Sequence, residues 1–114
     1  MKKIVGLLAT LLFSVTALAD HGGAPTPGQP LVIDVRTVGE YQDEHVRKAI
    51  NIPYDEIAAR INAFAPDIDT AIVLYCRSGR RAGIAEQTLR QMGYQHVKNQ
   101  GGLHDMVHEG YRTD

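Results

Sequence analysis

The chemistry of this chain centres on Cys76, the single cysteine among its 114 residues. One cysteine excludes an internal disulfide framework and a cysteine-rich zinc site. It is therefore either an inert buried residue at the end of a strand or a reactive thiol. The residues that follow it are Arg77, Ser78, Gly79, Arg80 and Arg81. Because nearby cations favour the thiolate, which is the nucleophilic form, the pattern predicts a reactive thiol.

The elements around Cys76 are expected to hold it at the edge of a sheet. Residues 71–75 form a continuous apolar run, typical of a strand at the centre of a covered parallel sheet. A helix is expected after Arg80, ending at Gly93. Its buried face is predicted from apolar spacing to comprise Ile84, Ala85, Thr88, Leu89 and Met92. Cys76 then lies at the carboxyl end of a strand, where ligands bind in open α/β sheets. The loop amides and the helix dipole would stabilise an anion there.

The rest of the mature chain predicts further alternation of strands and helices. Strands are expected at residues 31–35, 49–52 and 96–98, and helices at 37–44, 55–64 and 103–109. The first of these helices begins with a capping box formed by Thr37 and Glu40, and Gly101-Gly102 is expected to form a turn. This order predicts the α/β class, with one domain and a central parallel sheet flanked by helices on both faces.

The first nineteen residues have the three parts of a secretory signal peptide. Lys2 and Lys3 precede an uncharged apolar run that ends in the A-x-A site at residues 17–19. The run is too short for a typical membrane-spanning helix, so we expect cleavage rather than a retained anchor. We expect a cleaved signal at 1–19, a flexible Gly- and Pro-rich leader at 20–30 and the folded domain at 31–114. The mature protein would be periplasmic or secreted, with no membrane association.

Charge and the remaining motifs limit the partners. The net charge is −1 and becomes −3 when Lys2 and Lys3 leave, which argues against a nucleic-acid partner. His104 and His108 have the i, i+4 spacing of a metal pair, but no third ligand stands out. We interpret them as surface residues and expect neither a metal nor a cofactor. No apolar surface stripe is evident, and we expect a monomer.

Three segments, in order, resemble the rhodanese (sulfurtransferase) family over residues 31–111. The N-terminal signature is similar to Leu-Val-Ile-Asp-Val-Arg at 31–36, Glu40-Tyr41, His45 and Ala49-Ile50-Asn51-Ile52-Pro53. Cys76 to Arg81 resembles the active-site loop, and Gly101-Gly102 with Gly110-Tyr111 the C-terminal signature. Glu44 and residues 46–48, Val-Arg-Lys, replace the family's usual Gly and Ile-Pro-Gly, which leaves the form of that turn open.

This resemblance implies a thiosulfate sulfurtransferase. Cys76 would take the outer sulfur of thiosulfate, sulfite would leave, and cyanide or a thiol would then accept the sulfur from the cysteine persulfide. Loop amides of residues 77–81 would hold the persulfide, and their arginines would attract the anionic donor. By analogy, Asp34 would lie beneath the loop and brace an arginine, with Arg77 as the expected partner. A turn-capping role for Asp34 is the alternative.

Two other functions remain open. A non-catalytic module could carry or present the persulfide without turning it over. Cysteine phosphatases and arsenate reductases have related loops with a Cys-x5-Arg spacing. Here Arg81 is five residues after Cys76 and Ala82 is six, so the loop length disfavours this third reading.

Overall fold

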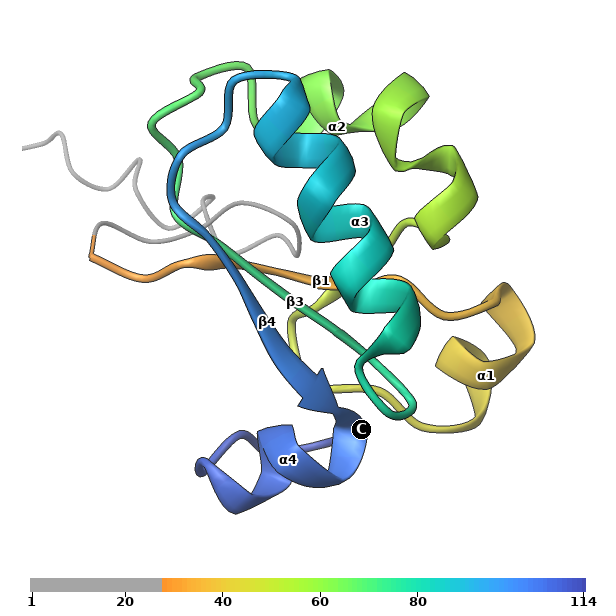
Figure 1. Cartoon of the computed structure of the whole chain (residues 1–114). Helices are drawn as coiled ribbons and strands as arrows, with labels where there is room; N and C mark the ends of the chain where they lie inside the picture. Colours follow the sequence, from red (N-terminus) through yellow and green to blue (C-terminus); the bar gives the residue numbers. More distant parts are fainter. Residues whose placement is uncertain (1–27) are drawn as a thin grey trace, which may run out of the picture.

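The computed structural model describes residues 28–114 (Figure 1). The predicted signal peptide and most of the predicted leader, residues 20–27, lie outside this range. The strands are β1 (Leu31–Asp34), β2 (Ile50–Asn51), β3 (Ile72–Cys76) and β4 (Val97–Gly102). The helices are α1 (Val38–Asp43), the 3-10 turn η2 (Tyr54–Glu56), α2 (Ile57–Phe64), α3 (Arg80–Gln91) and α4 (Leu103–His108). No helix within the described range is long and apolar enough to cross a membrane.

The four strands form one parallel sheet in the order β2-β1-β3-β4. Figure 1 shows α2 and α3 on one side of this sheet and α4 on the other. The predicted α/β fold, with a parallel sheet covered on both faces, is therefore confirmed. β3 occupies an interior position, so its carboxyl end, at Cys76, is flanked by strands on both sides.

Alternation along β3 assigns its side chains to two cores. Ile72, Leu74 and Cys76 belong to the larger core, which also contains buried residues of α2 and α3. Val73 and Tyr75 belong to the smaller core on the opposite face. This period of two is the geometry of an extended strand, and it explains why the whole run is apolar.

The smaller core is covered by short segments rather than by long helices. Val46, Ala49 and Met106 are buried in it. The C-terminal residues 112–114 pair antiparallel with residues 45–47 through the backbone: His45 N–H donates to Asp114 O at 3.2 Å, Arg47 N–H to Arg112 O at 2.8 Å and Asp114 N–H to His45 O at 2.8 Å. An ion pair between Arg47 and Asp114 adds to this contact. The end of the chain thus secures the 44–49 segment.

One prediction about local structure is only partly confirmed, and another is wrong. Of the predicted face of α3, Ala85 and Leu89 are buried, together with Ala82, whereas Ile84 and Met92 are 40% and 36% exposed. Small alanines face the sheet, where the helix lies close to β3 and β4. Gly101-Gly102 is not a turn between elements but the end of β4, where the pairing with β3 shifts register between Leu74 and Cys76.

Candidate active site

The loop between β3 and α3 surrounds the sulfur of Cys76 with backbone N–H groups. Gly79 N–H donates to Cys76 Sγ at 2.9 Å and Ala82 N–H donates to it at 3.4 Å. Gly79 has φ +101°, a left-handed conformation that glycine adopts without steric strain. This residue turns the chain from the strand into the first turn of α3. Gly79 is one of the residues predicted to hold the sulfur through loop amides, whereas Ala82 lies one residue beyond the predicted range.

These contacts change the acidity of a buried thiol. Cys76 is only 1% exposed, and burial by itself raises the pKa of the thiol. Hydrogen bonds from the backbone N–H groups of Ala82, Ser78, Gly79 and Arg81 outweigh burial and lower the pKa below its ordinary value. Such donors stabilise the charged form, so the loop favours a thiolate without any side-chain base.

The three loop arginines are not equivalent. Arg81 makes a two-point ion pair with Glu40 of α1, with Nη1–Oε1 at 2.8 Å and Nη2–Oε2 at 3.1 Å. This guanidinium, opposed by burial but assisted by Thr37, lowers the pKa of Glu40 to about 2. Arg77 and Arg80 are exposed, and within residues 28–114 neither makes an ion pair. Two positive charges at the loop are thus not neutralised by a carboxylate.

Glu40 also completes the cap of α1. Its backbone N–H donates to Thr37 Oγ1 at 3.2 Å, and its carboxylate accepts from Thr37 N–H at 3.1 Å. This is the capping box predicted from the sequence. One carboxylate therefore joins the first turn of α1 to the first turn of α3, beside the cysteine loop.

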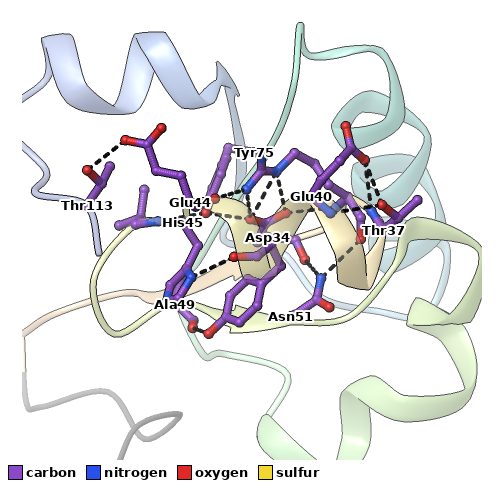
Figure 2. Close-up of polar contacts among 12 residues, drawn as sticks. Asp34, Thr37, Glu40, Glu44, His45, Ala49, Asn51, Tyr75 and Thr113 are labelled. Carbon is purple, nitrogen blue, oxygen red and sulfur yellow. Dashed lines mark hydrogen bonds and ion pairs between the residues drawn. The ribbon is translucent and has the colours of Figure 1, made fainter.

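Asp34 braces an arginine, but the predicted partner, Arg77, is wrong. Its partner is Arg36, which donates from Nη2 to Oδ2 at 2.7 Å and from Nε to Oδ1 at 3.0 Å (Figure 2). Asp34 pairs in register with Tyr75, so both side chains extend to the smaller core, whereas Cys76 faces the larger one. The sheet itself lies between the carboxylate and the sulfur, and Asp34 supports the fold on the far side from the loop.

Asp34 is the centre of a buried polar network. Tyr75 Oη donates to Asp34 Oδ2 at 2.7 Å and accepts from Val46 N–H at 2.9 Å. Burial and the nearby carboxylate raise the pKa of Tyr75, so the phenol remains a donor. Arg36 also donates to Glu44 O, which fixes the start of the 44–49 segment (Figure 2). In this segment His45 stacks on Tyr41 at 3.8 Å between ring centroids.

Strand β4 lies against the cysteine loop. A Cβ on Gly102 would overlap the Arg77 carbonyl, and one on Gly79 would lie 3.3 Å from Gly101 Cα. Asn99 Nδ2 donates to Gly79 O at 2.9 Å. The sequence reasoning missed Asn99, because an asparagine in a short strand carries no signal of a contact with a loop twenty residues earlier.

The other predicted candidates have exposed side chains. Ser78 is exposed, like Arg77 and Arg80, although its backbone N–H is among the donors that lower the pKa of Cys76. His104 and His108 are exposed on α4. Within the described part of the chain no three His, Cys, Asp or Glu side chains are grouped as metal ligands would be.

Comparisons with known proteins agree with this geometry. A family model described as "Rhodanese-like domain" matches residues 15–108. The chain is 49% identical over 104 residues, 90% of each chain, to "Thiosulfate sulfurtransferase PspE" of Escherichia coli. It is 32% identical over 68 residues, 60% of this chain and 36% of the relative, to "Putative sulfur carrier protein YrkF" of Bacillus subtilis. A solved structure, "rhodanese with anions from E. coli", has a TM-score of 0.70 at 42% identity, covering 75% of this chain and 96% of that one. The sheet, the cysteine loop and these matches together show that the chain belongs to the rhodanese-like family.

Proposed function

We propose that this protein is a thiosulfate sulfurtransferase that works through a persulfide on Cys76. The observation that carries the proposal is the cradle of backbone N–H groups around Sγ, which lowers the pKa of the thiol. The named activity of the E. coli relative supports the choice of donor.

The reaction needs two displacements at sulfur. In the first, the Cys76 thiolate attacks the outer sulfur of thiosulfate, the S–S bond of the donor breaks, and sulfite leaves with the electron pair. In the second, cyanide or a thiolate attacks the outer sulfur of the persulfide, and the Cys76 thiolate leaves. The product is thiocyanate or a new persulfide, and the free enzyme is regenerated, so ping-pong kinetics are expected.

The loop arginines have different roles, because only one of them is paired with a carboxylate within residues 28–114. Thiosulfate is a dianion, and the two exposed arginines, Arg77 and Arg80, are free to attract it. Arg81 is neutralised by Glu40 and acts as a support for the first turn of α3. The backbone amides of residues 77–82 then hold the outer sulfur of the persulfide, which carries the negative charge after transfer.

A second candidate is a carrier that accepts sulfur but turns it over slowly. It is favoured by the similarity to a putative sulfur carrier protein and by the depth of Cys76, which limits access for a large acceptor. A phosphatase or arsenate reductase is less favoured, because Ala82 occupies the position at which a Cys-x5-Arg loop has its arginine.

We also propose that the protein acts outside the cytoplasm. The charged start, apolar run and A-x-A site of residues 1–19 support export with cleavage after Ala19. The intact mass of the protein recovered from the periplasm or medium tests this: loss of residues 1–19 is expected, and an uncleaved chain in the cytoplasm would contradict export.

The test of activity is formation of thiocyanate from thiosulfate and cyanide. Wild type should turn over, and Cys76→Ser should show none while retaining its far-UV circular dichroism. If Cys76→Ser kept full turnover, both the enzyme and carrier proposals would fail. If wild type took up one sulfur without turnover, the carrier would be preferred.

The arginine roles have a matched test. Replacing both Arg77 and Arg80 by Ala should raise KM for thiosulfate by about tenfold or more, as expected for loss of charge-assisted contacts, and weaken its dependence on ionic strength. Arg60→Ala is the control, because Arg60 is an exposed arginine of α2 paired with Glu56. An equal KM in all three proteins would contradict the assignment.

A further inference from the structure

We propose that Asn99 is a positioning residue for the cysteine loop, acting through the backbone of Gly79. The role rests on the proposed function, because it matters for sulfur transfer only if Cys76 is the nucleophile. Asn99 lies on β4, outside the loop, and does not contact the sulfur.

Both ends of the Asn99 carboxamide are engaged. Nδ2 donates to Gly79 O at 2.9 Å, and Oδ1 accepts from Gly101 N–H at 2.9 Å. A carboxamide has one donor end and one acceptor end, so these two partners fix its orientation. The side chain thereby ties the end of β4 to the turn of the loop.

The carbonyl it holds belongs to the residue that contacts the sulfur. Gly79 donates its N–H to Cys76 Sγ at 2.9 Å, and its carbonyl also accepts the first helical hydrogen bond of α3 from Gly83 N–H at 2.9 Å. Because a peptide unit is planar, fixing the Gly79 carbonyl also fixes the direction of the next N–H, that of Arg80. Asn99 therefore orients the 79–80 peptide unit directly, and through the backbone dihedral angles of Gly79 it restrains the 78–79 unit, whose N–H contacts the sulfur.

No other side chain of residues 28–114 makes this contact. Within residues 28–114, Cys76 and Asn99 are the only side chains that hydrogen-bond to the backbone of residues 77–81. The remaining contacts between β4 and the loop are close backbone approaches at Gly101 and Gly102. Such packing limits distance but gives no direction to an N–H group. Gly79, free of a side chain and at φ +101°, is the loop residue most in need of such a restraint.

The test measures the acidity of Cys76 directly. The rate of alkylation by iodoacetamide as a function of pH reports the thiol pKa without requiring sulfur transfer. Asn99→Ala should raise this pKa by about 0.5–1 unit, which is a three- to tenfold loss of thiolate below the pKa. The value of kcat/KM for thiosulfate, measured below that pKa, should fall by a similar factor.

Two further variants separate positioning from folding. Asn99→Asp retains the shape and the acceptor for Gly101 but loses the donor to Gly79, so it should raise the pKa at least as much. Asn62→Ala is the control: Asn62 lies on α2 and accepts a hydrogen bond from Tyr94 Oη at 2.9 Å, and its loss should lower the melting temperature without changing the thiol pKa.

An unchanged thiol pKa in the Asn99 variants would overturn the proposal. If Asn99→Ala and Asn99→Asp keep the wild-type alkylation profile, Asn99 has no positioning role, whatever happens to the melting temperature. A wild-type protein that accepts no sulfur from thiosulfate would instead refute the proposed function, and the alkylation profiles would still decide the role of Asn99.

Discussion

At the scale of single residues, charge near Cys76 is arranged in pairs with two exceptions. Arg36 is paired with Asp34 and Arg81 with Glu40, while Arg77 and Arg80 are exposed and make no ion pair within the described range. Exposed arginines at a loop of amide donors are suited to draw a small dianion toward a buried thiolate. The paired arginines instead connect secondary-structure elements.

Glu40 provides a prediction about pH. Its pKa is lowered to about 2, mainly by Arg81, from an ordinary value of about 4.3. A lowered pKa stabilises the fold above the ordinary value, and this stability is lost as the pH falls through about 2. Glu40→Gln should therefore reduce the free energy of unfolding by about 1 kcal/mol at pH 7, a value that allows for partial exposure. The difference from wild type should shrink between about pH 4 and pH 2.

Urea unfolding at a series of pH values measures this effect. Glutamine can still complete the capping box with Thr37, so the variant isolates the ion pair with Arg81. Glu56→Gln serves as the control, because Glu56 pairs with Arg60 on the surface and should contribute little. A pH-independent loss in Glu40→Gln would contradict the assignment of its stability to charge.

Residue types in the sequence predicted the position of the reactive thiol, but they did not predict the ion-pair partner of every charged residue. The thiol and its arginines could be predicted because they are adjacent in sequence. The partner of Asp34 was predicted wrongly because the family resemblance placed Asp34 beneath the cysteine loop, whereas its side chain lies on the opposite face of the sheet. Arg36, two residues later, also donates its own N–H to Asp34 Oδ1 at 2.9 Å, a local contact that the alternation of β1 would have favoured.

At the scale of elements, the turn at residues 46–49 shows how the chain departs from its family. Ala49 N–H donates to Val46 O at 3.0 Å, and Lys48 has φ +72°. The turn thus persists with a lysine at a left-handed position where the family usually has glycine. The backbone pairing of residues 45–47 with the C-terminal residues helps to hold it.

Lys48→Gly should increase stability. Relief of the left-handed strain, about 1–2 kcal/mol, is partly offset by the greater entropy of glycine in the unfolded chain, about 0.4–1 kcal/mol. The free energy of unfolding in urea should rise by up to about 1.6 kcal/mol, the difference between these two effects. Lys98→Gly is the control, since Lys98 is an exposed lysine within β4 and loss of its side chain should destabilise the strand. Equal destabilisation in both variants would show that Lys48 is not strained.

Local signals predicted most element boundaries. The Thr37 cap and the stop of α3 at Gly93, which has φ +108°, are short-range features and are confirmed. The buried face of α3 was less predictable, because apolar spacing alone did not distinguish a face of small alanines against the sheet from a neighbouring face with Ile84. The distance between α3 and the sheet determines that small residues are buried there. This distance depends on tertiary packing and cannot be read from the spacing of apolar residues.

At the scale of the whole molecule, a buried polar network joins segments far apart in sequence. Tyr75 on β3 connects Asp34 on β1 with the backbone of Val46. The residues beside Val46 pair in turn with the C-terminus. Parallel strands could be predicted from their order, whereas this closure of the smaller core depends on contacts that no local pattern encodes.

Tyr75→Phe tests how much this network contributes to the free energy of unfolding. It leaves Val46 N–H buried without its partner and removes a donor from Asp34, so the free energy of unfolding should fall by about 1–3 kcal/mol. Tyr54→Phe is the control, because within residues 28–114 the Tyr54 hydroxyl makes no hydrogen bond. Thermal and urea unfolding of both variants give the comparison. A loss no greater than that of Tyr54→Phe would mean that the network adds nothing to stability.

The central claim, that Cys76 carries the transferred sulfur, is tested most directly by mass spectrometry of the purified protein after exposure to thiosulfate. We expect a gain equal to one sulfur atom, located on the peptide that contains Cys76 and lost on addition of cyanide. A protein that remains unmodified, or that gains sulfur while Cys76→Ser does so equally, would contradict it.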